Sequence, residues 1–287
     1  MNLNGRRRSS NVEDRRGISG KAAGGGIIAL IIGGIVYMLS GGSLTDYIGQ
    51  NAGQLLQNAP PLQHTAASAA DDEDLAAFSA QILAGTEDVW SEIFRRNGLT
   101  YTPPTLVLYN GSVSTACGTG TSAMGPFYCS ADEKLYIDLD FFRNMRRDIG
   151  ADGDFAYAYV IGHEVGHHVQ HLLGTLDQAH DRMSRMTQTD ANRESVRIEL
   201  QADYLAGVWA RYDNRMFGSL EPGDIDEALD AAIKIGDDYL QKKARGSVAP
   251  EAFTHGTSAQ RRRWLKAGLD SGTLFGGDTF SIPYSSL

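Results

Sequence analysis

Two histidines and a glutamate in the segment His163-Glu164-Val165-Gly166-His167 are the residues of this chain best suited to chemistry. On an α-helix, positions four residues apart lie on one face, so both imidazoles can reach the same metal ion. A zinc ion held by imidazole and carboxylate ligands lowers the pKa of its bound water to about 7. Glu164 would lie beside that water and could take its proton. The motif therefore predicts a site for one Zn²⁺ ion, suited to attack on a carbonyl.

A catalytic zinc site needs a third protein ligand, and it must come from another part of the chain. Successive four-residue steps drift around a helix axis, which disfavours His171 as a ligand. Downstream, Glu199 and Asp203 are four residues apart in a helical pattern. We expect Glu199 to bind the metal, with Asp203 or Glu194 as substitutes. We expect Asp203 to accept a hydrogen bond from the second ring nitrogen of a ligand histidine.

Small residues flank the candidate ligands on both predicted helices. Gly162 and Gly166 lie beside the histidines, and Ala202, Ala206 and Ala210 follow the carboxylates. Small side chains let two helix backbones approach closely. The two helices can therefore come near enough to share one ion.

Hydrophobic periodicity predicts the elements that position these groups, and the prediction is an α+β fold that is mainly helical. Two β-rich runs, residues 105–109 and 134–138, predict a small sheet. The motif helix should begin at an N-cap, Asp152 or Asp154, and end before Gly174. The first helix should begin at Asp72 and end at residues 97–98. Helical patterns cover residues 72–97, 140–148, 153–173, 190–213, 224–243 and 257–268.

Charge is unevenly distributed along the 287 residues. The net charge is −9, and residues 1–21 contain six basic and two acidic side chains, so the rest of the chain carries −13. This acidic balance argues against a nucleic-acid partner.

Residues 22–45 contain no charged side chain, and residues 27–39 are densely apolar. About 20 such residues can cross a bilayer, so we expect residues 22–42 to be a single transmembrane anchor rather than a cleaved signal peptide. The basic residues 1–21 should form a disordered cytoplasmic tail, which places the rest of the chain outside the cytoplasm. Residues 43–71 read as a flexible linker, and residues 72–287 as the folded domain.

Cys117 and Cys129 are the only cysteines. They could form a disulfide in an oxidising compartment, or they could be two free thiols. Their spacing is not that of a metal site.

Several segments of the chain carry a resemblance to a known family: Cys117-Gly118, Gly125-Pro-Phe-Tyr-Cys129, Tyr136-Ile-Asp138, His163-Glu-Val-Gly-His-His168, Glu199-Leu-Gln-Ala-Asp203, Gly207-Val-Trp209 and Thr254-His-Gly-Thr-Ser-Ala-Gln-Arg261. Together they resemble the neutral zinc metallopeptidases of bacteria, a membrane-anchored family. The resemblance implies a zincin-like fold with a glutamate as third ligand and a sheet edge over the active-site helix. An edge strand between residues 127 and 139 could hold an extended peptide by strand addition, or could be a plain hairpin edge.

Two further candidates follow from the late segment. His255 is similar to the late histidine with which other glutamate-liganded zinc peptidases stabilise the developing oxyanion, and the alternative is a surface or N-cap residue. One of Arg261, Arg262 and Arg263 could be a buried partner of the site, against a solvated basic face. The remaining histidines are expected to be structural or exposed: His64, His168, His171 and His180.

The sequence thus predicts a membrane-anchored zinc endopeptidase with a peptide or protein substrate. In this scheme Glu164 is the general base and acid. One alternative is a zinc-stabilised envelope binding or assembly factor that cleaves nothing. Another is an amidase acting on cell-wall peptides.

Overall fold

The structure, a computed structural model, describes residues 1–16 and 66–287. The predicted anchor, residues 22–42, lies outside the described residues, as do residues 43–65 of the predicted linker. No helix within the described ranges is long and apolar enough to cross a membrane.

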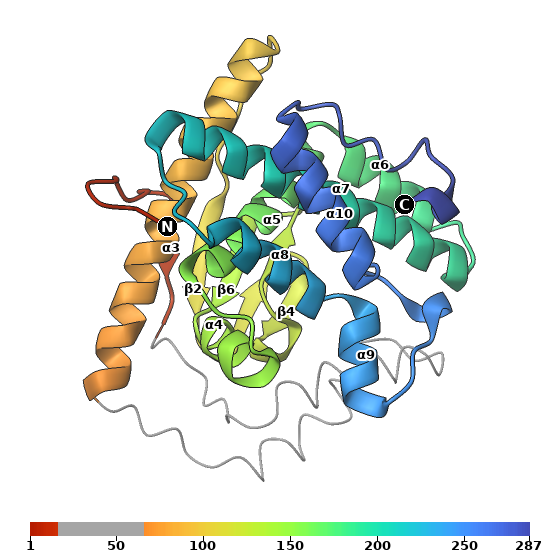
Figure 1. Ribbon diagram of the computed structural model, residues 1–287, viewed down its shortest axis with the longest axis horizontal. Coiled ribbons are helices and arrows are strands. Elements are labelled where there is room, and N and C mark those ends of the chain that lie inside the picture. The colour runs from red at the N-terminus through yellow and green to blue at the C-terminus, as the bar shows by residue number, and fades with distance from the viewer. Residues whose placement is uncertain (17–65) are drawn as a thin grey trace.

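Helices account for most of the described fold, and a small sheet accompanies them, in agreement with the α+β prediction. Figure 1 shows α3 on one side of the sheet and α6 and α10 on the other, with α7 running between them in contact with both α3 and α10. The helices are α3 (Ala66–Arg96), α4 (Asp140–Asn144) with a π-helical turn (Met145–Ile149), α5 (Asp154–Leu172), α6 (Thr175–Met183), α7 (Gln188–Phe217), α8 (Asp224–Lys234), α9 (Asp237–Arg245) and α10 (Ser258–Ser271).

The main sheet is mixed, with strand order β1-β2-β6-β5. β1 (Val12–Asp14), β2 (Thr105–Tyr109) and β6 (Lys134–Asp138) run parallel, whereas β5 (Phe127–Cys129) pairs with β6 in the antiparallel direction. β5 is therefore an edge strand, and it lies against α5. A separate hairpin consists of β3 (Ser112–Thr115) and β4 (Gly118–Thr121).

The strands predicted at residues 105–109 and 134–138 are confirmed, and so is the helical character of the site-bearing segments. Three boundaries were wrong. The first described helix begins before Asp72, at Ala66. The N-cap of α5 is Gly153, so neither Asp152 nor Asp154 caps it. The single helix expected over residues 224–243 is broken at residues 235–236, which makes α8 and α9 separate helices.

Residues 1–16 are an ordered part of the folded domain, so the expectation of a disordered tail was wrong for them. β1 extends the sheet through its pairing with β2. Arg6 pairs with buried Asp213 at 2.8 Å, and Glu13 accepts a bond from Lys134 at 2.5 Å. Residues 1–16 therefore pack as part of the folded domain.

The core surrounds α5. Ile161, Val165 and Val169 form its apolar face, and all three are fully buried. Leu172 packs at the margin of the same cluster. Burial of this face fixes the rotation of α5, and the side chains of His163 and His167 consequently point towards α7.

Candidate metal centre

His163 and His167 on α5 face Glu199 on α7. The Nε2 atom of His163 lies 3.1 Å from Glu199 Oε2, and the Nε2 atom of His167 lies 3.6 Å from Glu199 Oε1. One ligand atom from each residue lies within 4.8 Å of the others. The structure therefore brings together the three residues expected to bind the metal.

A glycine makes this approach of α5 and α7 possible. A Cβ atom on Gly166 would lie 2.9 Å from the Ala202 carbonyl oxygen and 3.2 Å from its Cα atom. Any larger residue would push the helices apart. The expected role of small residues is confirmed at this pair, whereas Gly162 packs against the ring of Trp209 rather than against backbone.

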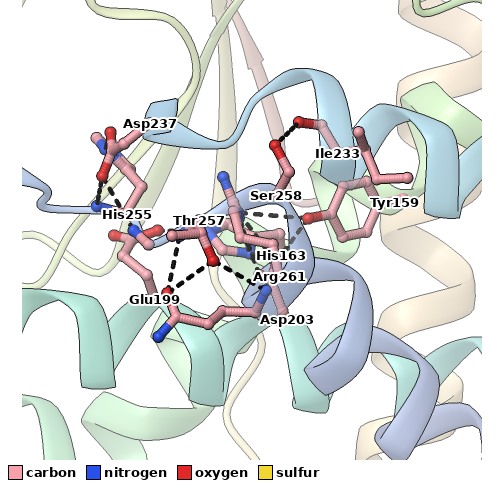
Figure 2. A network of polar contacts seen from close by, with 12 residues as sticks. Tyr159, His163, Glu199, Asp203, Ile233, Asp237, His255, Thr257, Ser258 and Arg261 are labelled. Carbon is pink, nitrogen blue, oxygen red and sulfur yellow. Dashed lines mark hydrogen bonds and ion pairs between the residues drawn. The ribbon is translucent and has the colours of Figure 1, made fainter. Parts of the chain in front are cut away.

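The Nδ1 side of His163 meets a buried charged cluster (Figure 2). Nδ1 lies 2.8 Å from Asp203 Oδ1, as expected for the carboxylate that orients a ligand histidine. Arg261 on α10 binds both oxygens of Asp203 at 2.9 Å, through Nε and Nη2. The hydroxyl of Tyr159 donates to Asp203 Oδ1 at 2.6 Å. Arg261 is thus the buried basic partner, and Arg262 and Arg263 are exposed.

Burial and charge act in opposite directions on this cluster. Burial favours a neutral His163, but Asp203 and Glu199 outweigh it and raise the pKa of the imidazole. Burial also penalises the Asp203 carboxylate, yet Arg261 and His163 hold its pKa below the ordinary value. The pKa of Glu199 is lowered against burial, by His167, His255 and His163. Both carboxylates are therefore ionised, which suits a cation site.

His167 has a different environment. Its Nδ1 atom lies 2.9 Å from Oε1 of Gln170, a neutral side chain on the same helix that is fully buried. Burial lowers the pKa of His167 to about 4, against the effect of Glu199. Its imidazole is consequently neutral, the form that binds metals.

Glu164 is buried beside the candidate ligands, at 7% exposure. Burial raises the pKa of its carboxyl group to about 7, and His163 opposes that shift. A carboxyl group with a pKa near neutrality can both accept and return a proton. Its position and its pKa suit the predicted role of general base.

His255 lies on the Glu199 side of the cluster, where Asp237 holds it (Figure 2). Asp237 Oδ2 accepts the backbone N–H groups of Thr254, His255 and Gly256 at 2.7–3.0 Å. Its Oδ1 atom lies 3.3 Å from His255 Nδ1. Burial acts to lower the pKa of His255, but Glu199 and Asp237 outweigh it and raise the pKa. The half-exposed imidazole is therefore fixed near the candidate ligands.

The edge strand β5 is linked to α5 through His168. The Nε2 atom of His168 lies 2.7 Å from the Thr102 carbonyl oxygen, so Nε2 donates and Nδ1 accepts from the Tyr128 hydroxyl at 2.9 Å. Cys129, at the end of the strand, forms a disulfide with Cys117. His168 is structural, as expected, and it connects the motif helix to the strand.

Other candidate residues lie outside the cluster. Glu194 pairs with Arg182 at 2.6 Å, and His171 lies 3.1 Å from Asp177, so neither joins the ligand group. Within the described residues, a second cluster of side chains is also close enough to hold a cation, and it consists of Asp154, Asp224 and Glu227. The amino group of Met1 contacts Asp154 at 2.6 Å and Asp224 at 3.3 Å, so a cation of the chain itself already lies there.

The donor set fits zinc. It offers two imidazole Nε2 atoms and one carboxylate, the ligand types of catalytic zinc sites. Both Nδ1 atoms face acceptors, which directs the Nε2 atoms towards the position that a metal would take. These residues could therefore hold one zinc ion.

Three residues that directly contact the candidate site residues were missed in the sequence: Tyr159, Gln170 and Asp237. Tyr159 and Gln170 lie four residues before His163 and three after His167, so helical spacing alone could have placed them beside the ligands. Asp237 was assigned to the middle of a helix. The signal there was Gly236, directly before two acidic residues, as at a helix N-terminus.

Comparison with known proteins agrees with this geometry. A family model described as "Putative neutral zinc metallopeptidase" matches residues 1–280. The chain belongs to this family. It is 47% identical to the uncharacterized protein YpfJ of Escherichia coli K12 over 98% of the chain and 99% of the relative. It is 43% identical to an uncharacterized protein of Mycobacterium tuberculosis H37Rv over 63% of the chain and 64% of the relative. No solved structure matches the chain.

Proposed function

We propose that this protein is a zinc-dependent endopeptidase with a zincin-like site. The observation that carries the proposal is the convergence of His163 Nε2, His167 Nε2 and the Glu199 carboxylate beside buried Glu164. A purely structural zinc site has no use for a base at this position. This favours an enzyme over a zinc-stabilised binding or assembly factor.

The residues divide the work as follows. His163, His167 and Glu199 would hold zinc, which when bound lowers the pKa of water and polarises a carbonyl. The carboxylate of Glu164 accepts a proton from the attacking water and then donates it to the departing amine. His255, oriented through Nδ1 by Asp237, directs Nε2 to the developing negative charge on the substrate oxygen.

β5 is the proposed substrate-binding strand. It is the edge of the sheet and lies against α5, and its backbone could pair with an extended peptide. The bond between Tyr128 and His168 and the disulfide at Cys129 both fix the strand relative to α5. An extended peptide held there would lie along α5, the helix that carries His163 and His167, which supports cleavage within a chain.

We also propose a membrane-attached location with the domain outside the cytoplasm. The uncharged residues 22–45 support attachment, and the disulfide supports an oxidising compartment. Because β1 is paired with β2, residues 1–16 should lie on the same side of the membrane as the domain.

Labelling can test that shared compartment. Ser10→Cys and Ser247→Cys would each add an exposed thiol, one to the N-terminal segment and one to the domain. An impermeant maleimide applied to spheroplasts should label both positions, and permeabilised cells provide the control. Labelling of the domain position alone would contradict the shared compartment.

Peptide hydrolysis tests the enzymatic proposal. The full chain, purified in detergent, should cleave members of an unbiased peptide library. A zinc chelator should abolish cleavage, and added zinc should restore it. Cleavage that continues at full rate after complete metal removal would overturn the proposal.

A further inference from the structure

A buried amide side chain connects the second ligand histidine to α7. Gln170 Oε1 lies 2.9 Å from His167 Nδ1. On the other side, Gln170 Nε2 donates to the Ile198 carbonyl oxygen and to Gln201 Oε1, each at 2.9 Å. On the side that faces α7, the Gln170 amide group therefore acts only as a donor, through its nitrogen.

The direction of these bonds follows from the partners. Gln201 Nε2 donates to the Gly277 carbonyl oxygen at 2.9 Å, so Gln201 Oε1 faces Gln170. The Ile198 carbonyl oxygen can only accept. Two acceptors thus occupy both N–H groups of Gln170, and its oxygen must face His167. That oxygen can only accept, so His167 Nδ1 carries the hydrogen and Nε2 keeps its lone pair.

Gly277 completes the chain of bonds because its backbone lies close to Tyr204. A Cβ atom at position 277 would lie 2.3 Å from the Tyr204 ring. Only glycine permits this approach. The Gly277 carbonyl oxygen is thereby held within reach of α7, and the segment after α10 takes part in the site.

We propose that Gln170, held by Gln201 and Gly277, is a positioning residue that fixes His167 in the tautomer able to bind zinc. The inference rests on the proposed zinc site. Without the Gln170 oxygen, the hydrogen on Nδ1 would be buried without an acceptor, which is costly. The imidazole then gains by moving the hydrogen to Nε2, where Glu199 Oε1 lies 3.6 Å away. That tautomer offers no lone pair to the metal.

Two substitutions at this position separate positioning from packing. Gln170→Met keeps the volume but removes both the acceptor and the donors. Gln170→Glu also removes the paired donors but keeps an acceptor towards His167. Zinc affinity of the full chain in detergent, measured by competition with a chelating dye at pH 8, should fall about tenfold or more in Gln170→Met. It should stay within about threefold of the wild type, or increase, in Gln170→Glu.

The matched control is Gln188→Leu, an exposed glutamine on α7 whose loss should leave zinc affinity unchanged. Selective ¹⁵N labelling of histidine in the metal-free protein gives a second readout, the Nδ1–H tautomer of His167 in the wild type and its loss in Gln170→Met. Equal loss of affinity in both Gln170 variants, or unchanged affinity in Gln170→Met, would overturn the inference. A wild-type protein that binds no zinc would instead refute the proposed function.

Discussion

The two candidate ligand histidines, His163 and His167, lie one helical turn apart, yet unlike groups orient them. His163 meets Asp203, whose charge Arg261 balances, so its support is ionic and joins α5, α7 and α10. His167 meets Gln170, so its support is neutral and joins α5 to α7. Both arrangements leave Nε2 directed at Glu199.

This difference predicts how each half of the site responds when the residue that orients its histidine is removed. Removal of one member of a buried ion pair leaves an uncompensated charge, which costs several kcal/mol. Removal of a neutral amide leaves only unpaired polar groups, which cost about 1–3 kcal/mol each. Loss of a supporting residue should therefore cost more fold stability in the His163 half than in the His167 half.

Arg261→Met should have the largest effect on stability. Asp203 is fully buried and would lose its cationic partner, so the free energy of unfolding should fall by about 3–5 kcal/mol. Urea unfolding of the metal-free protein measures it. Arg262→Met, the exposed neighbour on α10, should change stability by less than about 0.5 kcal/mol. Similar losses of unfolding free energy in the two variants would contradict the claim that the ion pair between Arg261 and Asp203 supports this half of the site.

His168 sharpens the comparison because it is a buried histidine of the same helix with neutral partners alone. Burial lowers its pKa to about 4 in the folded protein, from an ordinary value of 6.5. As the pH falls, His168 therefore binds a proton at a higher pH in the unfolded state than in the folded state. Stability from neutral His168 is complete above pH 6.5 and is lost as the pH falls towards 4, by about 3 kcal/mol at most.

Unfolding of the wild type and of His168→Gln between pH 4 and 7.5 measures this effect. The variant, which cannot titrate at this position, should lose less stability on acidification. Parallel pH profiles would show that a charge at position 168 is tolerated.

Asp203→Asn should weaken zinc binding about 10–100-fold, because a neutral amide orients His163 less strongly and leaves Arg261 unpaired. Competition with a chelating dye measures the affinity. The loss should exceed that in Gln170→Met if ionic support is the stronger of the two. A larger loss of zinc affinity in Gln170→Met than in Asp203→Asn would show that the neutral support of His167 is the stronger of the two.

Tyr159→Phe should have the smallest effect, since Asp203 keeps Arg261 and His163 as partners. Loss of one buried hydrogen bond should cost about 1 kcal/mol in unfolding free energy. Tyr157→Phe is the control on the same helix, because its hydroxyl bonds to exposed Asp152, and it should cost less. Equal effects would mean that the Tyr159 bond adds nothing specific to the cluster.

The sequence alone predicted the parts of the site that depend on helical spacing. His163 and His167 lie on one face because of the four-residue step, and the same step relates Glu199 to Asp203. The partner of Asp203 could not be chosen among Arg261, Arg262 and Arg263, since that depends on which face of α10 packs on α7. Tertiary contact, rather than local pattern, decides it.

The sequence was least informative about residues 1–16. Their basic, polar composition is typical of a disordered tail, but the strand Val12–Asp14 gains its stability from β2, which is more than 90 residues away. Composition does not record such a partner. The break between α8 and α9 also depends on a contact with a residue that is distant in the sequence, Ser258. Gly236 fits a helical pattern, yet a Cβ atom there would lie 2.5 Å from the Ser258 backbone nitrogen.

Glu164→Gln tests the central claim most directly, because it removes the base and keeps the shape of the site. The variant should retain zinc at the wild-type stoichiometry. Its hydrolysis of a peptide that the wild type demonstrably cleaves should fall by at least about 100-fold. Undiminished cleavage by a zinc-loaded Glu164→Gln protein would contradict the account.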